Sequence, residues 1–176
     1  MRIISRISIR FDPREDRLRL TMIDRGDETL VLWLTLRLAN ALVGGLLRAV
    51  EGLAISPEAV AGGQGAGKAA HQFWAQTKAE MEMVANAQGI RQSQAGVSEL
   101  VDRVALRRSP GEGRFVLELH WRGGSCAAPI DEIYLRQILK VLHRNYTLAG
   151  WSPAAVWPVW LGDEAHRSVL RTNEIN

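Results

Sequence analysis

The chain contains almost none of the residues from which small proteins build cross-links and thiolate sites. Its 176 residues include a single cysteine, Cys126, which excludes an internal disulfide and a thiolate metal cluster. Aromatic side chains make up 6% of the residues and hydrophobic side chains 47%. A chain of this length buries about 70% of its unfolded surface. We therefore expect a core of aliphatic side chains to hold the fold without a metal or a disulfide.

Long uncharged runs are missing as well. The longest stretch with little charge, 38–49, still contains Arg48, and it is shorter than the roughly 20 apolar residues of a membrane-spanning helix. The first eleven residues carry Arg2, Arg6 and Arg10, which does not fit the apolar segment of a signal peptide. We expect a cytoplasmic protein with no membrane partner.

Alternation of apolar and polar residues dominates the first third of the chain. Segments 3–11 and 17–23 alternate and are separated by turn residues that include Pro13, which is typical of a β-hairpin. A third strand is expected from Thr29, and Thr35 is a candidate helix N-cap. Leucine and valine then cover most of the circumference of a helix up to residue 53, as in a helix enclosed by a core. The first unit, 1–53, is therefore strand-strand-strand-helix.

A second unit, 99–150, repeats this order. Strands are expected at 100–108, 114–121 and 125–128, followed by a helix from about residue 131 to 148. When Arg25 is laid on Arg122, an offset of 97 residues, the two patterns stay in register without a gap. This match favours an internal duplication. The predicted fold class is α+β, with two such units around a shared core and an inserted helix; a β-sandwich or barrel head with flanking helices is the alternative.

The remaining segments differ from these units in composition. Segment 54–98 holds a glycine-rich linker and an inserted helix, expected over 68–88, with Phe73 and Trp74 close to one apolar stripe. The tail, 151–176, is rich in tryptophan and proline at its start. We expect it to lie across a groove of its own domain or of a neighbouring subunit, so that the chain forms one compact domain overall.

No motif predicts catalysis, a metal or a cofactor. Segment 62–69 approaches a phosphate-binding loop, but Ala69 stands where that loop needs a hydroxyl for Mg²⁺, and no strand is expected before it. The four histidines lack the spacing of a zinc helix, and no base for a Cys126 nucleophile is evident. We expect no catalytic residue, no metal, no cofactor and no small-molecule ligand. An enzyme whose site is assembled from distant residues stays open as an alternative.

Two candidate surfaces remain. A partner interface is predicted at Trp151, Trp157, Trp160, Phe73 and Trp74. A basic face is predicted on the outward side of the two hairpins, formed by Arg6, Arg10, Arg17, Arg19, Arg103, Arg107 and Arg114.

The basic face has two interpretations. Nucleic acid can bind such a face through its phosphates, but single-strand binders also stack bases on aromatics, and we expect no aromatic among the outward residues. Glu15, Glu118 and Asp102 are near enough in sequence to pair with the arginines, which favours a solvated face. We therefore expect a non-enzymatic scaffold or accessory subunit, homodimeric and with a protein partner. The alternative is a nucleic-acid-binding accessory protein that uses the basic face.

Overall fold

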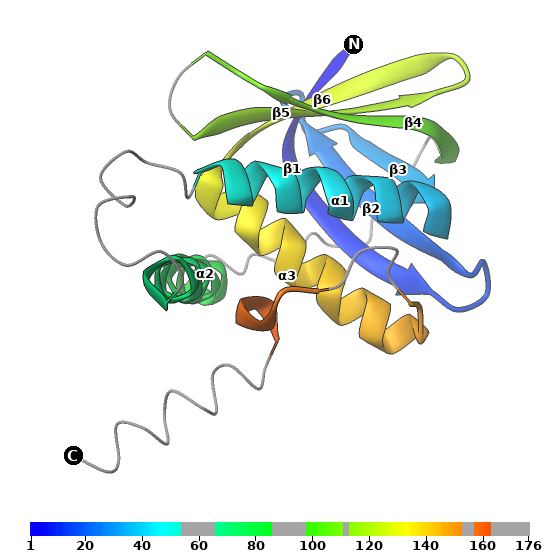
Figure 1. Cartoon of the computed structure of the whole chain (residues 1–176). Helices are drawn as coiled ribbons and strands as arrows, with labels where there is room; N and C mark the ends of the chain where they lie inside the picture. Colours follow the sequence, from blue (N-terminus) through cyan, green and yellow to red (C-terminus); the bar gives the residue numbers. More distant parts are fainter. Residues whose placement is uncertain (54–65, 86–97, 111–112, 153–156, 163–176) are drawn as a thin grey trace.

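Six strands and three α-helices form the computed structural model of the chain (Figure 1). It describes residues 1–53, 66–85, 98–110, 113–152 and 157–162. The mixed α+β class predicted from the sequence is confirmed. The elements in chain order are β1 (Arg2–Asp12), β2 (Arg17–Asp24), β3 (Thr29–Leu34), α1 (Leu36–Leu53), α2 (Ala66–Ala85), β4 (Ser98–Arg108), β5 (Arg114–Trp121), β6 (Gly124–Asp131), α3 (Glu132–Ala149) and a short 3₁₀ turn, η2 (Val159–Leu161).

The strands close into a barrel in the order β1-β2-β3-β4-β5-β6. Strands β1 to β3 are antiparallel to one another, and so are β4 to β6. Short parallel ladders, β3 with β4 and β1 with β6, join the two groups. The barrel of the alternative prediction and the two strand groups of the preferred one are thus both present.

The antiparallel ladder of β1 and β2 recurs in β4 and β5 at the offset of 97 residues. Ile7 faces Met22 in the first ladder, and Val104 faces Leu119 in the second. Each ladder also has one irregularity, between Ile4 and Arg6 in β1 and between Val101 and Arg103 in β4. The parallel joints do not follow this offset: Ile3 pairs with Ala127, whereas Leu100 pairs with Trp33. The two groups of strands are therefore alike within themselves and joined differently.

The core lies between the strands and helices α1 and α3. Leu18, Leu20 and Met22 alternate inward along β2, and Leu117 and Leu119 do so along β5. The buried side of α1 contributes leucine and valine at Leu38, Leu42, Val43, Leu46, Leu47 and Val50. The Leu-rich helix is thus central to the core, as the sequence predicted.

Helices α1 and α3 begin at the residues that their sequences indicate. Thr35 Oγ1 accepts a hydrogen bond from the backbone N–H of Leu38 at 3.5 Å, and the Asp131 carboxylate accepts one from Tyr134 at 2.8 Å. Both side chains satisfy an amide that the first helical turn leaves without an intrahelical partner. Gly150 ends α3 with a positive φ of 65°, which a residue without a Cβ adopts at little cost.

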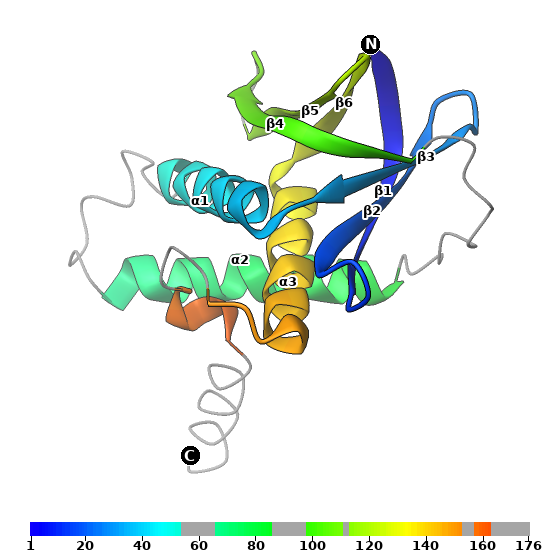
Figure 2. The same ribbon diagram turned by 90° about the vertical axis from the view of Figure 1, so that its right-hand side faces the viewer.

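Helix α2 packs on α3 through a polar face. Figures 1 and 2 show α2 on the side of α3 away from the strands, crossing it. Its buried residues include Gln72, Gln76 and Ala79, while the predicted stripe turns outward at Trp74 and Met81, with 62% and 70% of their surfaces exposed. That stripe is therefore not the packing face, because glutamine side chains bind α3 and α1 instead: Gln76 Nε2 donates to the Arg136 carbonyl at 3.4 Å, and Gln72 Nε2 to the Val50 carbonyl at 3.3 Å.

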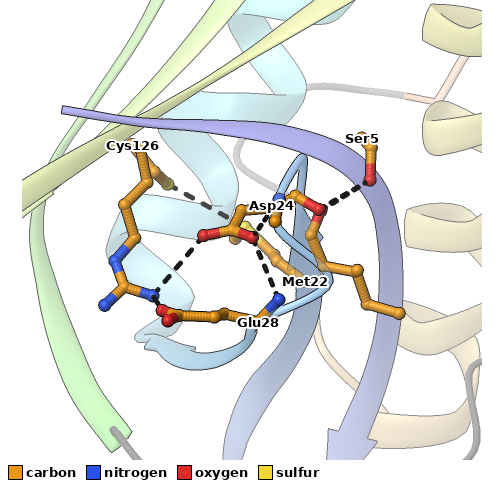
Figure 3. A network of polar contacts seen from close by, with 8 residues as sticks. Ser5, Met22, Asp24, Glu28 and Cys126 are labelled. Atoms are coloured by element: carbon orange, nitrogen blue, oxygen red, sulfur yellow. Dashed lines mark hydrogen bonds and ion pairs between the residues drawn. The ribbon is translucent and has the colours of Figure 1, made fainter.

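The turn between β2 and β3 is fixed by the carboxylate of Asp24. This carboxylate accepts hydrogen bonds from the backbone N–H groups of Gly26 at 2.8 Å and Glu28 at 3.0 Å; Figure 3 shows Asp24 beside Glu28. Arg2 binds Glu28 at 2.9 Å and lies 3.7 Å from Asp24. These acids thus hold the turn and the N-terminal strand together.

Several sequence-based predictions concern segments outside the described residues. They are the glycine-rich linker up to residue 65, which includes the first part of the loop-like segment 62–69, the end of the inserted helix beyond residue 85, and the tail beyond 162. The rest of the loop-like segment, from Ala66, belongs to α2. Among the helices that the structure describes, none is long and apolar enough to cross a membrane.

Candidate functional site

The tryptophans of the predicted partner interface pack within the chain. Trp151 and Trp157 each place a ring edge-on to Tyr146, with ring centroids 5.4 Å apart in both pairs. Trp160 lies against the guanidinium of Arg136, 5.7 Å from its ring centroid. These rings are half-buried against the core, so the exposed part of the predicted interface is the outer side of α2, at Trp74.

The predicted basic face lies on the outer side of the strands, and several of its arginines have acidic neighbours. Arg107 binds Glu118 at 3.0 Å, and Arg17 lies 3.9 Å from Glu15, as the sequence suggested. Arg6 lies 3.9 Å from Asp27. Arg10, Arg103 and Arg114 are exposed, and Arg17 and Arg19 are half-buried.

One aromatic side chain on this face was not expected. Arg19 lies over the ring of Trp33 at 5.9 Å from its centroid, and the Trp33 indole N–H donates to Ser98 Oγ at 2.7 Å. The statement that outward positions carry no aromatic is therefore wrong at Trp33. The outward position of Trp33 could not be predicted because the sequence of β3 is a continuous apolar run, in which inward and outward residues do not alternate in polarity.

A second candidate site, a groove beside α1, was not predicted from the sequence. A groove of about 510 Å³ lies between α1 and β4, within the range of sites that bind small molecules or side chains. Small residues of α1 form one wall, and strand residues of β4 and β5 form the other. The lining residues are Ala41, Leu42, Gly45, Arg48, Ala49, Gly52, Leu53, Val104, Leu106, Arg108 and Phe115.

Two cations flank this apolar groove. Arg48 and Arg108 are both exposed, and neither forms an ion pair within the part of the chain that the structure describes. Arg48 instead folds back along its helix toward Gly44, where its Nη1 lies 3.5 Å from the position of a Cβ. The groove therefore combines apolar walls with positive charge that has no internal partner.

The corresponding junction, between α3 and β1, is filled and hydrogen-bonded. Tyr134 Oη accepts the backbone N–H of Ile7 at 3.0 Å. The amide of Asn145 accepts the N–H of Phe11 at 2.6 Å and donates to the carbonyl of Ile9 at 3.3 Å. These side chains satisfy the main chain of β1 as a neighbouring strand would.

Aromatic rings complete that junction. Trp151 packs edge-on against Phe11 at 5.4 Å, and its indole N–H donates to Asp16 at 3.1 Å. Tyr146, 1% exposed, lies beneath Trp151 and Trp157. In the groove beside α1, Phe115 of β5 is the aromatic residue among the lining residues that the structure describes, and the α1 residues of that lining are not aromatic.

The offset of 97 residues explains the difference in residue terms. Where α3 has Leu142 and Tyr146, α1 has Gly45 and Ala49. The position of Asn145 is taken by Arg48 in α1. The groove thus lies where the second unit carries large and hydrogen-bonding side chains, and a comparison of the two helices in sequence already contained that signal.

Two side chains that could take part in catalysis, His120 and Cys126, are engaged by neighbouring residues or buried. His120 lies 3.6 Å from Glu118 and within 3.3 Å of the Arg103 guanidinium. Burial raises the pKa of the Cys126 thiol to about 11, so at neutral pH it is a protonated core side chain and not a nucleophile.

Arg136 is the most deeply buried cation of the described structure. Its Nε and Nη2 bind Glu132 at 2.9 Å. Burial lowers the pKa of Arg136, and the hydrogen bond and charge of Glu132 oppose this shift. The pair fixes the contact of α3 with Trp160 and has no free face for a substrate, because its guanidinium is only 1% exposed.

Neither a search for metal ligands nor a comparison with known proteins assigns a function to the chain. Within the described segments, no group of three or more histidine, cysteine or acidic side chains is arranged to hold a metal ion. Comparison of the chain with family models, with curated proteins and with solved structures finds no match.

Proposed function

We propose that the protein is a non-enzymatic accessory or scaffold protein that binds a protein partner in the groove between α1 and β4. The observation that carries this proposal is the groove itself, which has largely apolar walls and two arginines that form no ion pair with the described residues. Its counterpart between α3 and β1 is filled by Tyr146 and Trp151. An apolar concavity with a few charged groups at its margin is the usual form of a site that receives side chains.

A photo-cross-linking experiment tests this proposal. A benzoylphenylalanine at Ala41, on the exposed margin of the groove, is expected to give a discrete adduct with another protein in cells. The same cross-linker at Arg14, in the exposed β1–β2 turn, is the matched control. The adduct is expected to disappear when Gly45→Leu and Ala49→Tyr fill the groove with the residues that α3 carries. Equal adducts at both positions, or an adduct that survives the filling variant at an unchanged melting temperature, would refute the proposal.

A homodimer through α2 is a separate part of the proposal. Trp74 and Met81 are seven residues apart on the outer side of α2 and largely exposed. In an antiparallel pair of α2 helices, Trp74 of each copy packs against Met81 of the other, which suits an isologous interface. Light scattering tests this proposal: wild type is expected to be a dimer, and Trp74→Asp is expected to be a monomer. A wild-type mass of 19.5 kDa, that of one chain, would refute the dimer.

A second candidate function is binding of single-stranded nucleic acid on the outer face of β1–β3. Trp33 supports it, because it supplies a stacking surface beside Arg19 of the kind single-strand binders use. Binding of random oligonucleotides at low salt, weakened by Trp33→Ala and by added salt, is the expected result. A flat salt dependence, or no binding at low salt, would exclude this function.

The repeated strand-strand-strand-helix order is best explained, we infer, by an internal duplication. The shared ladder register and the matching irregularities in β1 and β4 support it. The groove then arose when one copy kept large side chains on its helix and the other exchanged them for small ones.

A further inference from the structure

One edge of β4 has no neighbouring strand over most of its length. β4 pairs with β5 from Val101 to Arg108, but with β3 only at Ser98–Leu100. Beyond Leu100 the described structure therefore leaves a row of main-chain groups beside α1. Open strand edges of this kind accept further strands.

The groups on this edge follow from the ladder. The N–H of Ser109 donates to the carbonyl of Arg114 at 2.9 Å, toward β5. Since main-chain groups alternate direction along a strand, the N–H and carbonyl groups of Val104, Leu106 and Arg108 point the other way, toward the open edge. β1 shows the same geometry, because its outward N–H groups, at Ile7 and Phe11, are those that α3 binds.

The side chains that cover the edge of β1 are absent at β4. Tyr134 and Asn145 correspond, at the offset of 97 residues, to Arg37 and Arg48. Arginine has five donors and no acceptor, so neither can bind the N–H groups of Val104 and Arg108. In the described part of the chain, no other side chain binds these groups.

We propose that the partner segment binds in extended form, as an added strand along the edge of β4, and that it is acidic. This inference rests on the proposed function and specifies how the groove is occupied. Main-chain hydrogen bonds to Val104, Leu106 and Arg108 supply the register, and alternate side chains enter the groove beside Gly45 and Ala49, which is the division of roles in β-strand addition.

The dimensions fit a short segment. Ala41 to Leu53 covers about 18 Å of helix at 1.5 Å per residue, and Val104 to Arg108 covers about 13 Å of strand at 3.3 Å per residue. An extended peptide of about five residues matches both walls. A segment of this length presents two or three side chains to the groove.

Charge argues against a second copy of this chain as the occupant. Pairing of two β4 edges brings the Arg48 and Arg108 side chains of both copies to one joint, and like charges across strands are destabilising. Glutamate or aspartate side chains of another protein complement the arginines and form bidentate contacts with them.

The test uses the full-length protein and a phage-displayed library of random twelve-residue peptides. Wild type is expected to enrich sequences that alternate acidic with β-branched or aromatic residues. The best peptide is then synthesised in two forms, N-methylated on one or on the other set of alternate residues. One form should bind at least about tenfold more weakly, because its methyl groups block the bonds to β4, and the other should bind as the parent does.

Two variants separate this mode from groove binding in general. Arg37→Tyr with Arg48→Asn places the covering side chains of α3 on α1, and should reduce binding at least about tenfold; Arg14→Asn with Arg25→Tyr is the charge-matched control and should not. A different result would overturn strand addition and leave the proposed function intact. In that case, the selected peptides would fail to bind the filling variant Gly45→Leu and Ala49→Tyr, but would bind wild type equally well with either methylation pattern. If wild type enriches no peptide at all, the proposed function fails with it.

Discussion

The junction of α3 with β1 and the junction of α1 with β4 are built on the same backbone plan and finished in different ways. At the first, Tyr134 and Asn145 bind the free edge of the strand, and Trp151 covers the helix. At the second, alanine and glycine at Ala41, Gly45, Ala49 and Gly52 take up little space, and a groove of about 510 Å³ remains. Strand pairing and helix placement therefore do not by themselves close a junction. A few side chains on the helix decide whether the edge is sealed or open.

The largest expected effect comes from emptying the filled junction. Tyr146→Ala removes a buried ring that two tryptophans contact, and should lower the free energy of unfolding by about 3–4 kcal/mol. Denaturant unfolding followed by tryptophan fluorescence measures it. Tyr146→Phe, which removes only the hydroxyl that donates to Asn40 at 3.0 Å, should cost about 1 kcal/mol. A similar small cost for both variants would mean that the ring does not hold the junction.

The second-largest loss of stability is expected from removing the Asn145 side chain, which binds the free edge of β1. Asn145→Ala leaves the N–H of Phe11 and the carbonyl of Ile9 without their partner, so a loss of about 2 kcal/mol in unfolding free energy is expected. The matched change in the other unit, Arg48→Ala, should alter stability by less than about 0.5 kcal/mol, because Arg48 is exposed and forms no ion pair with the described residues. Equal losses in the two units would contradict the asymmetry.

The two units also differ at the third strand, where β6 has Cys126 and β3 has Thr29. Burial raises the pKa of Cys126 from its ordinary value near 9 to about 11, so the folded state favours the protonated thiol. This contribution is fully present below pH 9 and is lost as the pH rises through about 11.

The expected size of that loss is about 2 kcal/mol by the top of the interval. Unfolding measured from pH 8 to 11 in wild type and in Cys126→Ala should show a shallower fall in the variant. Burial raises the pKa of Tyr134 and of Tyr146 as well, so some decline persists in both proteins. Parallel curves would show that the thiol ionises freely in the folded state.

The smallest expected change in stability comes from a variant that tests whether the groove is empty beside Gly45. The Cβ of Gly45→Ala would lie 3.9 Å from Leu106, an ordinary contact, and alanine is the better helix former by about 1 kcal/mol. The variant should therefore raise the melting temperature. Gly44→Ala, outside the groove lining, is the control for helix propensity alone. A melting temperature lowered by Gly45→Ala but not by Gly44→Ala would show that the groove is already closed at this point.

Much of the fold could be predicted from local sequence. Alternation identified both hairpins, Thr35 marked the start of α1 and Asp131 that of α3, and Gly150 marked the end of α3, because each of these signals acts within a few residues. The packing face of α2 could not be predicted, since it depends on hydrogen bonds from Gln72 and Gln76 to other helices. Apolar periodicity carries no information about such contacts.

The groove could not be predicted for a different reason. It is defined by what α1 lacks at Gly45 and Ala49, and small residues in a helix give no positive signal of a site. The offset of 97 residues that aligns the two units also shows where they differ, as at Arg48 against Asn145. Only the three-dimensional pairing of β4 shows that its main chain has no neighbouring strand there.

Native-state hydrogen exchange followed residue by residue is the most direct test of the open edge. In the free protein, the amides of Ile7 and Phe11 should be strongly protected, because Tyr134 and Asn145 bind them. The amides of Val104 and Arg108, at the same register positions of β4, should exchange at least about a hundredfold faster, in line with the range of local opening energies within one fold. Equal protection at the four amides would mean that both edges are covered, and the groove would then lose its place as a binding site.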